Sequence, residues 1–301
     1  MTETLACQDV IYAFSKEHTP VKRVASGTTI EIETYDCFKN QVTSPETKIA
    51  GIDWDEINPA TGPVFIEGAE PGDVLKVRID KLEIGDQGVM ATGPDLGVLG
   101  HRLEELTSKI IPVKDGHAVF DDKLKIPVNK MIGVIGVAPD GEPVSCGTPG
   151  AHGGNMDTKL ITEGATLYFP VFAEGALFAL GDFHAAMGDG EIGVSGIEVP
   201  GKATVTLEVV KEGALRHPLV ENGDGIAFIV SAPTLDEAAK AAVEEMADFL
   251  LPRTELDLPD IAMMLSAAGQ VQVSQIVDPL MTARFFLPNY VLEAYGVKVF
   301  G

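Results

Sequence analysis

Ala176-Leu-Phe-Ala-Leu-Gly-Asp-Phe-His-Ala-Ala-Met-Gly-Asp-Gly-Glu191 constrains the fold more than any other run, because an apolar segment leads into a turn rich in glycine and acid. Residues 176–180 predict a buried strand that ends in Asp182 and His184. Residues two apart on a strand project from the same face, so these two side chains should share one space. The glycines that follow predict a turn that brings Glu191 back toward His184.

Asp182, His184 and Glu191 form a candidate metal site. Imidazole nitrogen combined with carboxylate oxygen suits zinc or a similar divalent ion, and three protein ligands leave a position for water. Glu191 is expected to be either a ligand or a general base. The alternative is a hydrogen-bonded His–Asp pair without a metal, with Asp189 an ordinary turn residue in Gly-Asp-Gly.

A second polar phrase, Gly147-Thr-Pro-Gly-Ala-His-Gly-Gly-Asn-Met-Asp157, lies upstream of the first. The glycines that flank His152 allow the backbone to approach a ligand closely. A loop that needs positive φ angles is the alternative explanation for them.

Five short sequence motifs occur in the chain in a characteristic order and spacing. Through these motifs the chain resembles the acetamidase/formamidase family over nearly its whole length. They are Asn58-Pro-Ala-Thr-Gly-Pro63, Glu67-Gly-Ala-Glu-Pro-Gly-Asp73, Thr148-Pro-Gly-Ala-His-Gly-Gly-Asn-Met-Asp157, Gly181-Asp-Phe-His-Ala-Ala-Met-Gly-Asp-Gly-Glu191 and Val273-Ser-Gln-Ile-Val-Asp-Pro279. The resemblance implies a β-rich, cytoplasmic homo-oligomer, a dimer or tetramer, that hydrolyses short aliphatic amides to carboxylate and ammonia. It also implies a divalent metal, for which we expect zinc, with calcium as the alternative.

The resemblance leads us to expect hydrolysis of the amide by a metal-activated water. Backbone N–H groups of residues 150–155 would hold the developing oxyanion, and His152 or a carboxylic acid would protonate the departing ammonia. The expected catalytic residues are Glu191, His152, Asn155 and Asp53; the expected substrate-binding residues are Asn58, Gly153 and Gly154; and the expected metal ligands are Asp182, His184 and Glu191.

Other functions stay open from the sequence alone. Cys146 is close enough to His152 in the chain to be an amidase nucleophile, although a small buried side chain is the simpler reading. Another metal-dependent hydrolase or lyase acting on a small carbonyl compound would use the same acids. A noncatalytic β-barrel that binds calcium or a small ligand would also be rich in acidic, glycine-containing turns.

The composition limits the class of partner. The chain has 301 residues, 45% of them hydrophobic, and a formal net charge of -23. Nucleic acid and anionic membrane need basic patches, so neither is an expected partner, and a neutral or cationic small molecule is. Three cysteines without CxxC spacing fit a reducing compartment, and the N-terminus does not resemble a signal peptide, so we expect the cytoplasm.

The pattern of elements predicts a mainly β protein, α+β overall. Residues 1–232 carry short strand-like runs separated by turns, which is typical of a sandwich or barrel and gives a β-rich catalytic region. Residues 233–301 should form a helical segment and a returning strand that pack on it as one integrated unit. Thr234-Leu-Asp-Glu237 is a capping box, a second helix should end at a left-handed Gly269, and a third segment should surround Gln275.

Overall fold

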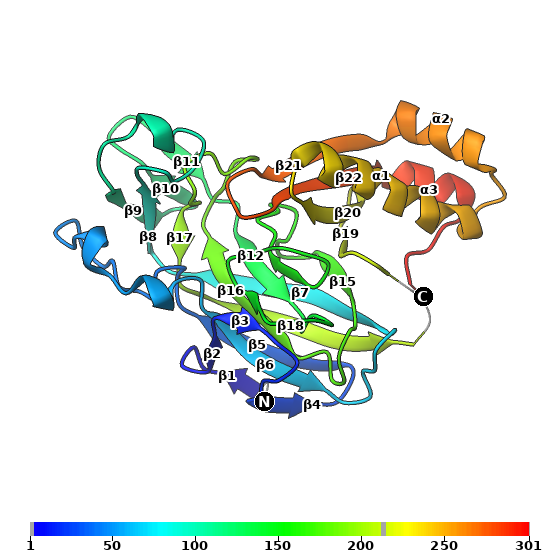
Figure 1. The fold of residues 1–301 in the computed structure, drawn as a ribbon, viewed down its shortest axis with the longest axis horizontal. Coiled ribbons are helices and arrows are strands. Elements are labelled where there is room, and N and C mark those ends of the chain that lie inside the picture. The colour runs from blue at the N-terminus through cyan, green and yellow to red at the C-terminus, as the bar shows by residue number, and fades with distance from the viewer. Residues whose placement is uncertain (1–2, 212–214, 301) are drawn as a thin grey trace.

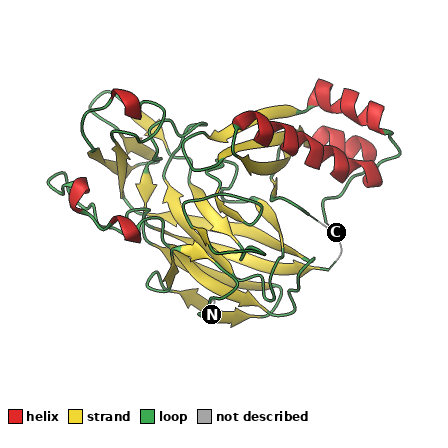
Figure 2. Cartoon of the chain, viewed as in Figure 1, coloured by secondary structure: helices red, strands yellow, loops and turns green. Residues whose placement is uncertain are grey.

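The chain, described here by a computed structural model over residues 3–211 and 215–300, is built mainly from strands, with its three α-helices gathered at one end (Figures 1 and 2). The predicted class, mainly β and α+β overall, is confirmed. In these two ranges, no helix is long and apolar enough to span a bilayer.

One mixed sheet of nine strands joins the N-terminal and C-terminal parts of the chain. The antiparallel pairing of β20 with β22 runs from Gly225 opposite Pro288 to Ala232 opposite Met281, so the returning strand continues the sheet. Its strands, in spatial order, are β1 (Glu3–Leu5), β5 (Thr28–Thr34), β18 (Gly201–Val210), β7 (Val74–Ile84), β15 (Thr166–Pro170), β19 (Leu219–Glu221), β20 (Gly225–Ala232), β22 (Met281–Pro288) and β21 (Gln270–Gln275).

A second, eleven-stranded sheet carries most of the polar phrases found in the sequence. Its main path is β11 (Lys125–Pro127), β10 (His117–Val119), β9 (Thr107–Lys114), β8 (Gln87–Thr92), β17 (Glu198–Val199), β16 (Phe178–His184), β12 (Met131–Gly136) and β14 (Gly153–Asn155). From β16 it branches to β6 (Ala60–Ile66), which also pairs with β2 (Val10–Ile11) and β4 (Lys22–Val24). A small ribbon pairs β3 (Ala13–Phe14) with β13 (Val144–Ser145).

The two large sheets share one apolar core. Ile32 and Val77 of the first sheet belong to the same buried cluster as Ile132, Phe178 and Leu180 of the second. Burial of each such side chain contributes roughly 1.5–3 kcal/mol. The expected strand at residues 176–180 thus begins at Phe178, after Ala176 and Leu177 in left-handed conformations, and it is buried along its whole length.

The helices follow the predicted pattern at first and then depart from it. They are α1 (Leu235–Leu250), α2 (Leu258–Ala268) and α3 (Asn289–Tyr295), together with the short 3-10 helices η1 (Ile49–Gly51), η2 (Trp54–Glu56), η3 (Gly100–Arg102) and η4 (Leu251–Arg253). The capping box of Thr234 and Glu237 is confirmed at the start of α1. The apolar face of α1 packs on β20 and β22, with Phe249 against Phe228.

Two predictions about the C-terminal segment are wrong. Gly269 has an extended backbone with φ of -81°, and glycine is needed there because a Cβ would lie 2.1 Å from the ring of Phe285. The residues up to Gln275 form strand β21 instead of a helix, as the alternation of Gln and Val at 270–273 would favour. The third helix begins only at Asn289.

Candidate active site

His184, the last residue of β16, is surrounded by buried carboxylates. Its Nε2 lies 3.1 Å from Glu198, 3.5 Å from Asp182, 3.8 Å from Asp157 and 4.0 Å from Glu191. Ligand atoms of Asp157, His184 and Glu191 all lie within 4.8 Å of one another. The predicted convergence of Asp182, His184 and Glu191 is therefore present, and two further acids join it.

The backbone around this cluster is shaped to bring the acids together. Asp157, Asp182 and Glu191 all have left-handed backbones, with φ of 41°, 57° and 48°. Such conformations cost about 1–3 kcal/mol each for residues other than glycine and concentrate at functional sites. Gly133, in the middle of β12, leaves the space that the carboxylates occupy: a Cβ there would lie 2.3 Å from Asp182 Oδ2 and 2.4 Å from Asp157 Oδ1.

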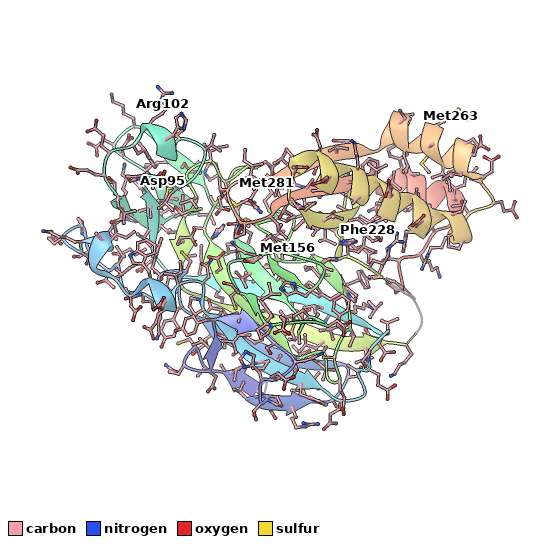
Figure 3. The ribbon with its side chains drawn as sticks, viewed as in Figure 1. Asp95, Arg102, Met156, Phe228, Met263 and Met281 are labelled. Atoms are coloured by element: carbon pink, nitrogen blue, oxygen red, sulfur yellow. The ribbon has the colours of Figure 1, made fainter. Side chains whose placement is uncertain are left out.

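A cavity of about 260 Å³ opens above the cluster. Asp182, Glu191 and Glu198 form part of its wall, and Asn155 and Asp278 complete the polar side. No Lys or Arg lines it among the residues that the structure describes. The remaining wall is largely apolar and includes Cys37, Phe38, Trp54, Ile57, Ala91, Leu96, Val194, Val277 and Pro279. In Figure 3 the neighbouring Met156 lies near the middle of the molecule, between the arm with Asp95 and Arg102 and the helical end with Met263.

Burial and mutual repulsion shift the pKa values of the acids. Burial, followed by the charge of Asp182, raises the pKa of Asp157 to about 7, and burial raises the pKa of Glu198 to about 8. Burial, followed by the charge of Asp157, raises the pKa of Glu191 and of Asp278 well above their ordinary range. Burial alone would lower the pKa of His184, but Glu198 and Asp182 raise it well above its usual value.

The donor set fits a divalent cation. Both oxygens of Asp157, both ring nitrogens of His184 and Oε2 of Glu198 are buried without a hydrogen-bond partner. Five carboxyl groups, counting Asp278, gather around one imidazole here, and a bound cation would favour their ionised forms. Buried charges are costly unless they are paired or coordinate a metal, and mixed imidazole and carboxylate ligands suit zinc.

Asn58 and Asn155 both reach the cavity. Asn155 Nδ2 donates to Asp278 Oδ2 at 3.0 Å, which leaves its Oδ1 buried without a partner. Asn58 is held in a left-handed conformation, its N–H donates to Cys37 O, and its side chain lies beside Gly147.

Of the glycine phrase around His152, Gly147 and Asn155 line the cavity and the residues between them do not. His152 is buried against the edge of Phe14 and is not among the residues that line the cavity. Burial lowers its pKa to about 4, so it is neutral at pH 7 and unsuited to deliver a proton. The Gly153 N–H donates to Gly150 O, and Gly153 and Gly154 pair with β12. A Cβ at Gly153 would lie 2.3 Å from Ile135 O of β12, and a Cβ at Gly154 would lie 2.4 Å from Thr148 O.

Asp53 and Cys146 also do not line the cavity. Asp53 and Asp55 do not share a strand face; Asp53 is exposed and caps the short helix η2 by accepting from the Asp55 N–H. The turn chemistry of residues 53–58 thus overrides the strand spacing, and Trp54 lines the cavity instead. Cys146 is fully buried, burial raises the pKa of its thiol to about 12, and the thiol donates to Ile11 O.

Sequence reasoning missed Glu198, Asp278 and Cys37 and assigned no role to Asp157. Glu198 lies directly opposite His184 in the antiparallel pairing of β16 and β17. The signal for it was an acid inside the apolar run Ile197-Glu-Val199. Asp278 belongs to the turn between β21 and β22, and in the sequence its phrase, residues 273–279, indicated only the family resemblance. Cys37 is within ligand distance of Asp182 and Glu198 but comes from a distant loop.

Comparison with known proteins agrees with the sequence motifs. The acetamidase/formamidase family model matches residues 12–145 and 141–294. A predicted acetamidase/formamidase from the thermophile Thermoanaerobacter tengcongensis shares 54% identity and a TM-score of 0.97, over 99% of both chains. Acetamidase from Bacillus halodurans shares 46% identity and a TM-score of 0.95, over 98% of this chain and 100% of that one. Formamidase from Methylophilus methylotrophus is 24% identical over 259 residues, which cover 65% of this chain and 63% of that protein. The chain thus spans less than two thirds of that formamidase.

Proposed function

The chain belongs to the acetamidase/formamidase family, and we propose that it hydrolyses short linear amides such as formamide and acetamide to the carboxylate and ammonia. The observation that carries the proposal is the buried His184 with its surrounding acids, which open on a small cavity of mixed polar and apolar lining. A pocket with few convergent polar groups and strongly shifted pKa values is the usual form of an active site.

We propose that His184, Asp157 and Glu191 hold a divalent metal, with zinc as the expected ion. These residues offer ligand atoms within 4.8 Å of one another, and the atoms of Asp157 and His184 have no other partner. When bound, such an ion supplies a Lewis acid for the carbonyl oxygen and lowers the pKa of water. Asp182, the third ligand that the sequence suggested, falls in a second set with Cys37 and Glu198.

The cavity residues are placed to bind the amide and to move its protons. Asn155 Oδ1, which lacks a partner, is the acceptor that we assign to the amide NH₂ of the substrate. Asp182 and Glu198 line the cavity, so they are the carboxylates that we assign to accept the proton released when water attacks and to pass it to the departing ammonia. The apolar wall formed by Phe38, Trp54 and other residues would contact the acyl group and exclude bulk water.

The acidic lining of the cavity suits a neutral substrate. An amide is uncharged, so it enters beside Asp182, Glu191 and Glu198 without charge repulsion.

The test measures ammonia release from formamide and acetamide by three samples: protein as purified, protein from which a chelator has removed metal (chelated protein), and chelated protein to which zinc has been returned. We expect turnover to vanish with the metal and to return with zinc. Asp157→Asn should lower turnover at least a hundredfold, whereas Asp115→Asn, an exposed acid with the same left-handed backbone, should not change it. Turnover that survives thorough chelation would refute the metal, and no turnover on any short amide would refute the proposed activity.

A further inference from the structure

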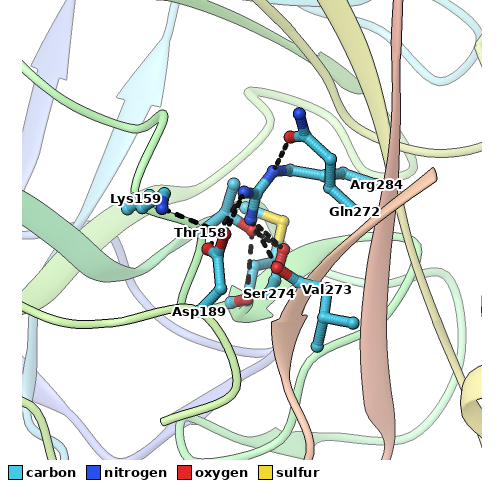
Figure 4. Close-up of polar contacts among 8 residues, drawn as sticks. Thr158, Lys159, Asp189, Gln272, Val273, Ser274 and Arg284 are labelled. Atoms are coloured by element: carbon cyan, nitrogen blue, oxygen red, sulfur yellow. Dashed lines mark hydrogen bonds and ion pairs between the residues drawn. The ribbon is translucent and has the colours of Figure 1, made fainter. Parts of the chain in front are cut away.

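Arg284 is a buried cation close to the acid cluster. It lies on β22, its side chain is 1% exposed, and every guanidinium nitrogen has a partner. Nε donates to Gln272 Oε1 at 2.7 Å, and Nη1 donates to Val273 O at 2.8 Å and to Ser274 Oγ at 3.1 Å. Nη2 donates to both carboxylate oxygens of Asp189 at 2.9 Å (Figure 4). A buried guanidinium with all of its nitrogens engaged has one rigid position.

The contact with Asp189 fixes the loop that carries Glu191. Asp189 precedes Glu191 by two residues, and Gly190 between them donates its N–H to Ser274 O at 2.8 Å. The loop is therefore held to β22 by the ion pair with Arg284 and to β21 by the backbone bond to Ser274. Asp189 is thus an anchor for the loop and more than the turn residue that its sequence suggested.

A second contact reaches the segment that carries Asp157. Thr158, the next residue, donates its hydroxyl to Ser274 Oγ at 2.7 Å, the same oxygen that accepts from Arg284 Nη1. Figure 4 shows Thr158, Ser274 and Asp189 gathered around the guanidinium. Arg284 thus connects the backbone next to Asp157 with the backbone next to Glu191, and the ion pair between Lys159 and Asp189 at 3.0 Å joins the same two segments (Figure 4).

These contacts oppose forces that would separate the two acids. Asp157 and Glu191 both have left-handed backbones, which would relax and move the two carboxylates if their segments were free to move. We propose that Arg284 is a positioning residue that sets the separation of Asp157 and Glu191, and so controls metal affinity without touching metal or substrate. The inference rests on the proposed function, because it assumes that these two acids are metal ligands.

The test compares the zinc affinity of variants from which metal has first been removed. The affinity is measured by competition with a chromogenic chelator. Arg284→Lys keeps the charge but cannot contact Gln272, Ser274 and Asp189 at once, and Asp189→Asn keeps the shape of the partner but removes its charge. Loss of a group that orients metal ligands typically costs about 10–100-fold in affinity, so both variants should bind zinc at least tenfold more weakly. Asp248→Asn is the control, since Asp248 pairs with the exposed Arg216 and should change the affinity less than twofold.

Thermal unfolding of the chelated proteins and the kinetics of the zinc-loaded proteins separate positioning from simple support of the fold. Neither Arg284 nor Asp189 lines the cavity. Asp189→Asn should therefore lower kcat for formamide by misplacing the metal ligands, while KM changes only a few fold. A lower melting temperature with unchanged zinc affinity would overturn the inference. If Arg284→Lys does not fold, Asp189→Asn decides by comparison with Lys159→Gln, because Asp189 is 34% exposed and also pairs with Lys159. A loss of zinc affinity that Lys159→Gln reproduces in full would overturn the assignment to Arg284. If the parent protein binds zinc and both variants match it, the inference alone fails; if the parent binds none, the proposed metal and the inference fail together.

Discussion

Gly133→Ala should disable the site through a single added methyl group. Gly133 lies in the middle of β12, where a Cβ would meet Asp182 Oδ2 at 2.3 Å and Asp157 Oδ1 at 2.4 Å. Ordinary contacts begin near 3.4 Å, so each oxygen must move by about 1 Å. Both carboxylates are almost completely buried, so neither can swing into solvent. The methyl group therefore pushes both acids away from His184.

The structure gives two magnitudes for this change. A displacement of about 1 Å in a reacting group costs on the order of a hundredfold in rate, so we expect turnover to fall by at least that factor. Crowding a packed interior costs about 1–3 kcal/mol of folding free energy, which corresponds to a melting temperature lower by roughly 2–6 °C. The loss of activity should therefore greatly exceed the loss of stability.

The assay is ammonia release from formamide together with thermal unfolding followed by circular dichroism. Gly141→Ala is the matched control, because a Cβ at Gly141 meets nothing within 4 Å and the backbone there is not left-handed. A Gly133→Ala protein that melts like the parent and keeps turnover within a few fold would refute the assignment of Asp157 and Asp182 to the site.

Three further predictions follow from burial. Cys146→Ala should keep turnover within a few fold, because the thiol is buried away from the cavity and its pKa is raised to about 12. A loss of ammonia release in a folded variant would support Cys146 as the nucleophile. His152→Ala should lower the unfolding free energy by about 2–4 kcal/mol in a denaturant titration and leave kcat within a few fold, and a hundredfold fall in kcat would contradict this. In chelated protein, burial raises the pKa of Asp157 to about 7 and of Glu198 to about 8, above their unfolded values near 4, so the folded state holds protons that the unfolded state has released. Stability should then fall as pH rises from about 5 to 9, by up to about 1.4 kcal/mol per unit for each group, and thermal melts that rise over this range would exclude it.

The part of the site that could be predicted lies close together in the chain. Strand spacing and a glycine turn were enough to bring Asp182, His184 and Glu191 together, although Asp182 reaches the site through a left-handed backbone that simple alternation does not include. The β-rich class and the capping box at Thr234 follow from local patterns in the same way. In each case the deciding interactions span only a few residues.

The rest of the site depends on pairings that no local pattern encodes. Glu198 faces His184 because β16 and β17 pair in one particular register, and Asp278 arrives from a turn more than a hundred residues after Asn155. Asp53 shows the opposite error: Asp53 and Asp55 are two residues apart, a spacing typical of one strand face, but they belong to a capped 3-10 helix. Gln275 is the last residue of the edge strand β21 and lies in no third helical segment.

The bond between Asn155 and Asp278 also bears on how a newly made chain would acquire the proposed metal. It joins residues 123 positions apart, so the wall that Asp278 supplies is synthesised well after the acids that it encloses. Glu191, the last of the three proposed ligands, precedes Asp278 by 87 residues (278 minus 191). At about 5–20 residues per second, that interval is roughly 4–17 s. During it, Asp157, His184 and Glu191 have all been synthesised without the segment that later encloses them. A metal ion would then reach these residues before the cavity closes, without the finished protein having to open.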